Sequence, residues 1–239
     1  FCVGTSMAFS LARYASLSWD ALKKILKRGV LLYLTGLLLT AFPFYPSASE
    51  MNPNLSFWQN WLAWAGELRL VGILARIAMC YVLGSVLVLW LQSNKKIGIA
   101  MGVLCALHVG LLLIFAGPEG AFTLEGNFAR KFDVALLGEN HVYTGYGIPF
   151  DPEGIFGALT GTCTVLIGYL IGRMIRQSNA RFAEEGKVED SPTGISARMF
   201  AISAASLLLG LALSIWIPIN KPLWSVSYVF YAGGWAIFV

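Results

Sequence analysis

The sequence is poor in charge. Only 13% of its 239 residues are Asp, Glu, Lys or Arg, whereas 57% are apolar and the mean hydropathy is +0.67. A soluble domain carries about 25% charged residues, so this chain has too few to cover a water-facing surface. The composition excludes a soluble globular protein and predicts an integral membrane protein with the lipid bilayer around it.

Several motifs are also missing. The chain has no Walker loop, dinucleotide glycine motif, HExxH or GxSxG, which argues against the commoner hydrolase and nucleotide-binding families. All four cysteines lie inside apolar runs, so they predict no disulfide framework, and we expect no metal (Cys2, Cys80, Cys105, Cys163). The net charge of +4 does not indicate nucleic-acid binding, because the basic residues are sorted by loop.

Long apolar runs are what the sequence does contain. A spanning helix needs about 20 mainly apolar residues. Five runs meet this length, and two partial runs flank them (26–44, 70–91, 97–116, 154–175 and 198–217, with 1–17 and 224–239). Because the runs are continuous rather than alternating, they predict helices rather than barrel strands. We expect an all-α transmembrane bundle of about seven segments, a single domain over 1–239 that is incomplete at both ends.

Basic residues are concentrated in every second loop. Loops 18–25, 92–96 and 176–197 are rich in Lys and Arg, which by the positive-inside rule places them in the cytoplasm. The other loops are acidic or nearly neutral and are predicted to be periplasmic in a bacterial inner membrane (45–69, 117–153 and 218–223). The cytoplasmic cations either bind the phosphates of a nucleotide-containing donor or only follow this rule (Lys27, Arg28, Lys95, Lys96, Arg173, Arg176).

The outer loop 117–153 is unusually long, and a loop of this length in a compact protein is functional or disordered. Its apolar positions predict a short amphipathic helix over 124–137 that lies on the bundle. Its end, with the first residue of the next run, reads GENHVYTGYGIPFDPEG and gathers acids around one histidine (Glu139, His141, Asp151, Glu153).

The DPEG turn has two readings. Asp151 suits the N-cap of a helix, Pro152 its first turn and Glu153 its positive end. A functional role for the two carboxylates stays open beside this helix start. Likewise, His141 alone is either a surface histidine or part of a site.

Two arginines lie near the outer side of one predicted span. Arg69 and Arg76 are seven residues apart, so a helix would place them on one face, about 10.5 Å apart along the axis. An ionisable group within a span is a functional candidate and normally has a partner. We expect Arg76 to pair with Asp151 or Glu153, the alternative being that it only joins helices or reaches outward to water. His108, near the middle of another span, is either a hydrogen-bonded packing residue or a proton relay.

Several stretches together resemble one family. LRLVGILARIAMCY, LLGENHVY followed by FDPEGIFGAL, and PINKPLWSVSYVFYAGGWA are similar, in this order, to the heparan-alpha-glucosaminide N-acetyltransferase family and its bacterial relatives, which are described as acyltransferases or as a domain of unknown function. The opening FCVGTSMAFSLAR resembles an early span of that family. Two departures are Ala75, where the family commonly has Gln, and the segment from Ala158 to Gly161.

The resemblance implies an enzyme that transfers an acetyl group from cytoplasmic acetyl-CoA to a glucosamine amine or glycan on the other side of the membrane. A second copy of the chain is a further expected partner. The sugar side would be formed by residues of the outer loops (His141, Asp151 and Glu153, supported by Asn140, Arg69, Arg76, Asn220 and Lys221). The family's catalytic histidine lies upstream of Phe1, so this fragment is expected to be inactive alone. The alternatives are a transporter or flippase for a glycan or small solute, and a non-catalytic partner subunit.

Overall fold

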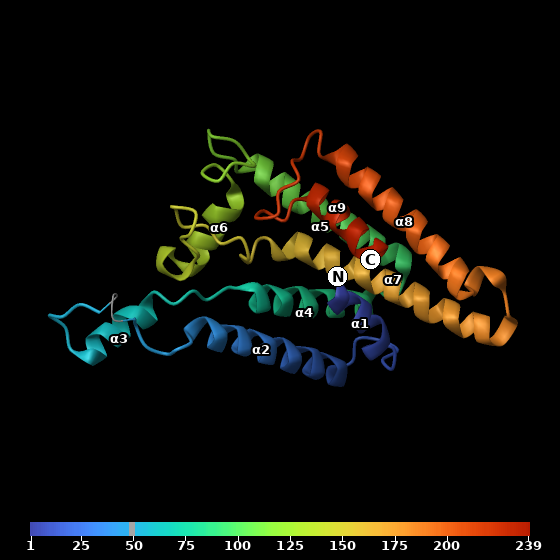
Figure 1. Ribbon diagram of the computed structural model, residues 1–239, viewed down its shortest axis with the longest axis horizontal. Coiled ribbons are helices and arrows are strands. Elements are labelled where there is room, and N and C mark those ends of the chain that lie inside the picture. Colours follow the sequence, from blue (N-terminus) through green and yellow to red (C-terminus); the bar gives the residue numbers. More distant parts are fainter. Residues whose placement is uncertain (48–50) are drawn as a thin grey trace.

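The computed structural model describes residues 1–47 and 51–239, and all regular structure in them is helical (Figure 1). The described residues form nine α-helices and two short 3₁₀ helices. These are α1 Cys2–Ser10, α2 Trp19–Ala41, α3 Phe57–Gly66, α4 Ile73–Leu91, α5 Asn94–Ile114, α6 Phe128–Leu137, η1 Glu139–His141, α7 Ala158–Glu185, η2 Val188–Asp190, α8 Pro192–Leu213 and α9 Val226–Phe238. The prediction of an all-α protein is confirmed.

Four helices, α4, α5, α7 and α8, are long and apolar enough to cross a membrane. They correspond to four of the predicted spans. The other three segments differ from expectation, because α1 has 9 residues, α9 has 13, and α2 carries four basic residues in its first half. Seven crossing segments therefore stay a prediction, while an integral membrane protein with four candidate spans is established.

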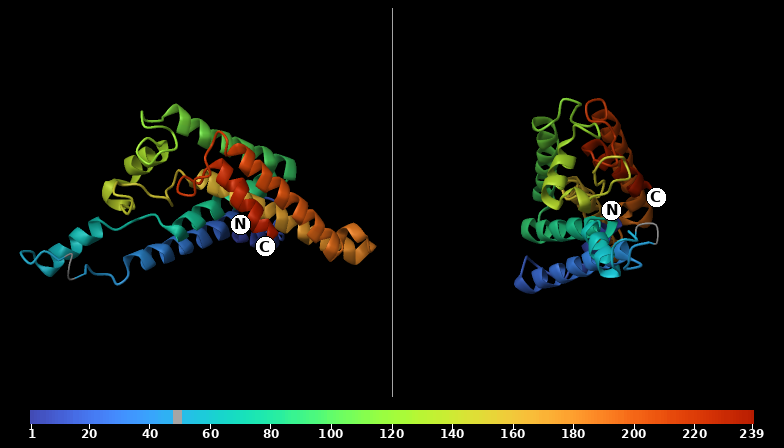
Figure 2. Two further views of the ribbon diagram at one scale, coloured as in Figure 1. Left: turned by 45° about the horizontal axis from the view of Figure 1, so that its top comes forward. Right: turned by 90° about the vertical axis from the view of Figure 1, so that its left-hand side faces the viewer.

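Helix α7 occupies the middle of the fold. It packs against α1, α4, α5 and α9, while α2 packs on α4 and α8 packs on α9. Figures 1 and 2 show the result, with α2 on the far side of α4 from α5, α8 and α9. The larger hydrophobic core lies along α7 and is built mainly from its contacts with α1 and α4.

Glycines let α1 lie directly on α7. A Cβ on Gly4 of α1 would stand 1.8 Å from the carbonyl oxygen of Val165, and one on Gly168 would stand 2.2 Å from that of Phe1. The backbones therefore touch, as small residues allow between membrane helices. Gly154 and Gly157 lie before α7, which begins at Ala158.

Helix boundaries move two of the predicted loops. The Ser18 side chain caps α2 by accepting from the Ala21 amide at 3.2 Å, so most of loop 18–25 is helical. Helix α7 continues to Glu185 and ends at Gly186, whose φ of 65° suits glycine. The first part of loop 176–197 is consequently the last turns of α7.

The loops gather at two ends of the bundle (Figure 1). One end, called the acidic end below, carries α3, α6 and the loop before α7. The opposite end, called the basic end, carries the α1–α2, α4–α5 and α7–α8 connections. Which end faces the cytoplasm rests on the charge pattern and stays a prediction.

Candidate functional site

At the acidic end, an arginine lies between two acids. Arg69 Nε donates to Asp151 Oδ2 at 2.8 Å, and its Nη2 donates to Asp151 Oδ1 at 2.6 Å and to Glu153 Oε2 at 2.5 Å. Burial acts to lower the pKa of Arg69, but the hydrogen bonds and charges of Asp151 and Glu153 outweigh it and raise this pKa above its usual value. The structure thus brings three of the sequence-predicted residues together.

The DPEG turn is not a helix start. Helix α7 begins at Ala158, so the interpretation of Asp151 as its N-cap is wrong. The Asp151 carboxylate instead accepts hydrogen bonds from two backbone amides. One, at 2.9 Å, comes from Glu153 in its own turn, and the other, at 3.2 Å, comes from Tyr143 in the neighbouring loop segment. Side-chain oxygens of Asp commonly bond to the backbone two residues on, and this preference outweighs helix capping here.

Our predicted partner for Arg76 is also wrong. Asp151 and Glu153 pair with Arg69, which is not on the helix, because α4 begins at Ile73 after the cap residue Gly72. Arg76 is buried, 6% exposed, and its Nε and Nη2 make no hydrogen bond to any described residue. Its guanidinium lies 4.4 Å from the centre of the Trp224 ring, a cation–π contact that joins α4 to the segment before α9.

His141 is held by backbone groups. Its Nδ1 lies 2.8 Å from the Leu68 carbonyl oxygen, and the Leu70 amide donates to the His141 carbonyl at 3.1 Å. These bonds fasten the loop after α6 to the segment between α3 and α4. Arg69 also lies over the Tyr143 ring at 5.0 Å. His141 therefore belongs to the frame around the Arg69 cluster, and the Asn140 side chain next to it is exposed.

A pocket of about 350 Å³ adjoins Arg69. It lies between the end of α2, α3 and the connection to α4, and its polar lining includes Asn60, Glu67 and Arg69 beside Trp64. The volume falls in the range of small-molecule sites. Glu67 forms no ion pair with a described residue. The sequence analysis did not single out Glu67 and Trp64, although both lie within five residues of Arg69 in the chain.

Asp133 is a third residue that the sequence analysis did not single out. It lies on α6, is 2% exposed, and accepts from the Phe156 amide at 3.1 Å just before α7. Gly154 makes room for it, since a Cβ there would stand 1.8 Å from Asp133 Oδ2. Burial raises the pKa of Asp133 to about 7. The sequence feature that could have indicated Asp133 is an acid on the inward face of α6, whose other inward positions are apolar.

Asn220 and Lys221 lie apart from the Arg69 cluster. Asn220 Oδ1 accepts from the Leu223 amide at 3.0 Å, and its Nδ2 donates to the Phe122 carbonyl at 3.5 Å. It lines a pocket of about 140 Å³ with Tyr146 and Phe150, on the other side of the long loop. Lys221 is exposed and makes no side-chain bond to a described residue. Asn220 therefore shapes the α8–α9 connection.

His108 is fully buried on α5, and its ring lies 4.9 Å from that of Phe156. Neither ring nitrogen has a hydrogen-bond partner among the described residues. His108 therefore packs beside Phe156, and the choice between a packing residue and a proton relay stays a prediction.

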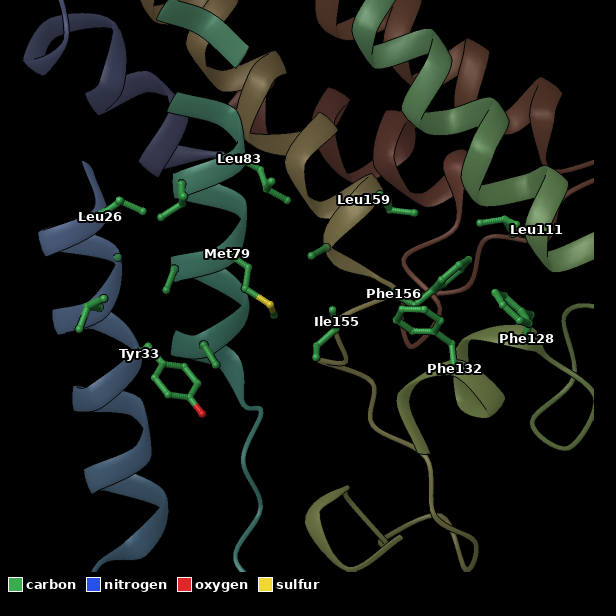
Figure 3. Close-up of a pocket in the computed structure, with 16 residues that line it drawn as sticks. Leu26, Tyr33, Met79, Leu83, Leu111, Phe128, Phe132, Ile155, Phe156 and Leu159 are labelled. Atoms are coloured by element: carbon green, nitrogen blue, oxygen red, sulfur yellow. The ribbon is translucent and has the colours of Figure 1, made fainter. Parts of the chain in front are cut away.

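An apolar cavity of about 690 Å³ is lined by residues of α2 and α4 on one side and of α5, α6 and the start of α7 on the other (Figure 3). Phe128, Phe132 and Phe156 close it on the acidic side, and Leu26 and Leu83 line its other end. The Tyr33 hydroxyl is the one oxygen among the drawn side chains. The cavity suits hydrocarbon rather than a sugar or a nucleotide.

At the basic end, the six predicted donor-side cations are dispersed. Arg173 Nη1 donates to the Gln92 carbonyl at 3.2 Å, and Arg176 Nη1 donates to the Ala8 carbonyl at 2.7 Å, so both tie α7 to neighbouring helices. The exposed side chains of the others lie on α2 and α5 (Lys27, Arg28, Lys95, Lys96). Of these six cations, Arg28 lines two hollows between described residues.

The helical spans, the charged acidic end and the hollows beside it define a polytopic membrane protein with ligand-sized pockets. Along its whole length the chain is similar to heparan-alpha-glucosaminide N-acetyltransferase of Mus musculus and of Homo sapiens, 24% identical over 291 aligned positions in each case. The predicted resemblance is thus confirmed as a distant full-chain similarity to this membrane acetyltransferase family. The chain spans about two-fifths of these relatives, 41% of the mouse and 40% of the human protein. No protein-family model matches the chain.

Proposed function

We propose that this chain forms the core of a membrane acetyltransferase that moves an acetyl group from acetyl-CoA in the cytoplasm to the amine of an amino sugar across the membrane. The observation that carries the proposal is the similarity along the whole chain to two enzymes whose name states N-acetylation of a glucosaminide. The acidic end would face the acceptor and the basic end the donor.

The pocket beside Arg69 is the proposed acceptor site. Asp151 and Glu153 are already paired with Arg69, so they position this arginine rather than bind an ammonium themselves. Glu67 carries the carboxylate that is free to attract an amino sugar, and Trp64 offers an aromatic face to the sugar ring. The attacking amine must lose a proton to a base of suitable pKa. The resemblance assigns this base to a histidine upstream of Phe1.

The test uses the full-length protein in detergent with acetyl-CoA and glucosamine or a glucosamine-ended glycan. We expect acetyl transfer, and we expect Glu67→Gln to raise KM for the amino sugar about tenfold, a loss of about 1.4 kcal/mol in binding. Glu139→Gln, an exposed acid of the same end, is the matched control and should leave KM unchanged.

Two results would contradict the proposal in different ways. Equal KM values for Glu67→Gln and the parent would mean that the acceptor does not bind in this pocket. Full-length protein that acetylates no amino sugar, but moves a labelled glycan across liposomes, would establish the transporter alternative instead.

A further inference from the structure

Arg76 is a buried cation that forms no ion pair with a described residue. It lies on α4, a candidate membrane span, and is 6% exposed. Its Nε and Nη2 make no hydrogen bond to a described residue. A buried charge without compensation is strongly destabilising, and an ionisable group within a span normally has a partner. The position therefore suits a ligand that accepts hydrogen bonds and carries negative charge.

The carboxylates at the acidic end are engaged with other groups. Asp151 and Glu153 form their ion pairs with Arg69. Asp133 accepts from the Phe156 amide at 3.1 Å. None of these three acids forms an ion pair with Arg76. The compensating charge therefore has to come from outside the described part of the chain.

The first turn of α7 lies directly against the guanidinium of Arg76. A Cβ on Gly157 would stand 2.2 Å from Arg76 Nη2, and one on Gly161 would stand 3.9 Å from Arg76 Nε. Gly157 is the N-cap residue of α7, where no described side chain caps the helix and no acid occupies the first turn. The N-terminus of a helix carries a partial positive charge, and its amide groups donate to anions. Two groups of donors with positive charge thus meet at one place.

The surroundings of the guanidinium restrict the ligand to a small ion. The Trp224 ring lies 4.4 Å from the guanidinium carbon and contacts its face, while the hydrogen-bond donors lie along its edge. The two glycines approach it from α7, and Cys80 Sγ would stand 2.7 Å from a Cβ on Gly161. A single-atom anion needs the least space beside this edge.

We propose that Arg76 and the N-terminus of α7 bind a chloride ion. The ion joins α4, α7 and the segment before α9, because Arg76, Gly157 and Trp224 belong to these three elements. None of these residues lines the proposed acceptor pocket. The chloride site is therefore separate from the proposed reaction, and its test does not depend on acetyl transfer.

The first experiment measures thermal unfolding of the full-length protein in one detergent while sodium chloride replaces sodium gluconate at constant ionic strength. A ligand that binds only the folded state raises Tm, so chloride should raise the Tm of the parent saturably, by about 3 °C or more. Arg76→Met replaces the charge by an apolar side chain, and its Tm should not respond to chloride. Lys131→Met removes an exposed cation of the acidic end and should respond as the parent does.

Two further measurements keep the test independent of whether Arg76→Met folds. Arg76→Lys keeps the charge but loses the planar fork of donors, so the half-saturating chloride concentration should rise about fivefold or more. Crystals of the parent grown in bromide should show an anomalous scattering peak between the Arg76 guanidinium and the first turn of α7.

Three results would overturn the chloride site. The first is a parent Tm that is equal in chloride and gluconate, with a water molecule in place of bromide at Arg76. The second is a chloride response of Arg76→Met equal to that of the parent, which would place the ion elsewhere. The third is equal stabilisation of the parent by sulfate, which would show that the site is not restricted to a single-atom anion.

Discussion

Arg69 and Asp151, 82 positions apart in the chain, are joined by two parallel hydrogen bonds of 2.8 and 2.6 Å. The Asp151 side chain is 0% exposed, whereas that of Arg69 is 26% exposed. Paired bonds between a guanidinium and a carboxylate are strong and fix geometry. This pair fastens the α3–α4 connection to the loop before α7, so it sets the arrangement of the acidic end.

Removing the arginine should leave a buried carboxylate unpaired. We expect Arg69→Met to lower the free energy of unfolding by about 3–5 kcal/mol, measured by thermal or denaturant unfolding in one detergent. Lys221→Met removes an exposed cation at the same end and should stay within about 0.5 kcal/mol of the parent. An equal effect of both variants would mean that water satisfies Asp151.

Asp133 predicts a dependence of stability on pH. Its pKa of about 7 in the folded protein lies above the ordinary 3.8, so the folded state binds this proton more tightly than the unfolded state. Its stabilising contribution is fully present below about pH 4 and is lost as pH rises to about 7, by up to about 1.4 kcal/mol per pH unit.

Asp133→Asn isolates that contribution. The amide keeps an oxygen for the Phe156 amide proton but cannot ionise, so the variant should gain stability relative to the parent as pH rises from 4 to 7. Unfolding of both proteins at each pH unit measures the difference. If the free energies of unfolding of the two proteins changed with pH in parallel, Asp133 would ionise in the folded protein as it does in water.

The contact between α1 and α7 should not tolerate a methyl group. Gly4→Ala would place its Cβ 1.8 Å from the Val165 carbonyl oxygen, so the helices must separate. We expect a loss of about 1–3 kcal/mol, as for other overpacked sites. Gly102→Ala, on α5 with no atom within 4 Å of its Cβ, is the control and should be neutral. Equal stabilities would mean that α1 is loosely held.

The orientation can be tested by labelling single cysteines in a protein that lacks the four native ones. We expect an impermeant thiol reagent added outside to modify Thr144→Cys and not Asn179→Cys, both at exposed positions. Thr144 is preferable to Gly145, where a Cβ would stand 2.2 Å from the Tyr143 ring. The reverse labelling pattern would invert the donor and acceptor sides.

Continuous apolar runs made the main helices predictable, because length and hydropathy are local properties. The partners of charged residues were not local. Arg69 and Arg76 both lie near one predicted span, and no local pattern indicates that α4 begins at Ile73, between them. Asp151 and Glu153 pair with Arg69, which lies outside the helix. Pairing there removes less of the arginine's charge from water than pairing with the buried Arg76 would.

Asp133 was missed for a related reason. Periodicity showed that α6 is amphipathic, but the burial of one acid depends on where the segment before α7 approaches it. The DPEG motif fits a helix start and an Asp-centred turn equally well by composition. Only the position of Arg69, far away in the chain, decides between them.

Helix α2 lies between two hollows of the structure. One face, with Gly29, Val30 and Tyr33, borders the apolar cavity, and the opposite face, with Arg28 and Thr35, borders a groove of about 550 Å³ between α1, α2 and α4. Since α2 packs on α4 and stands away from α5, α8 and α9, its displacement as a rigid rod changes the width of both hollows together. A ligand that displaces α2 would therefore change the width of both hollows.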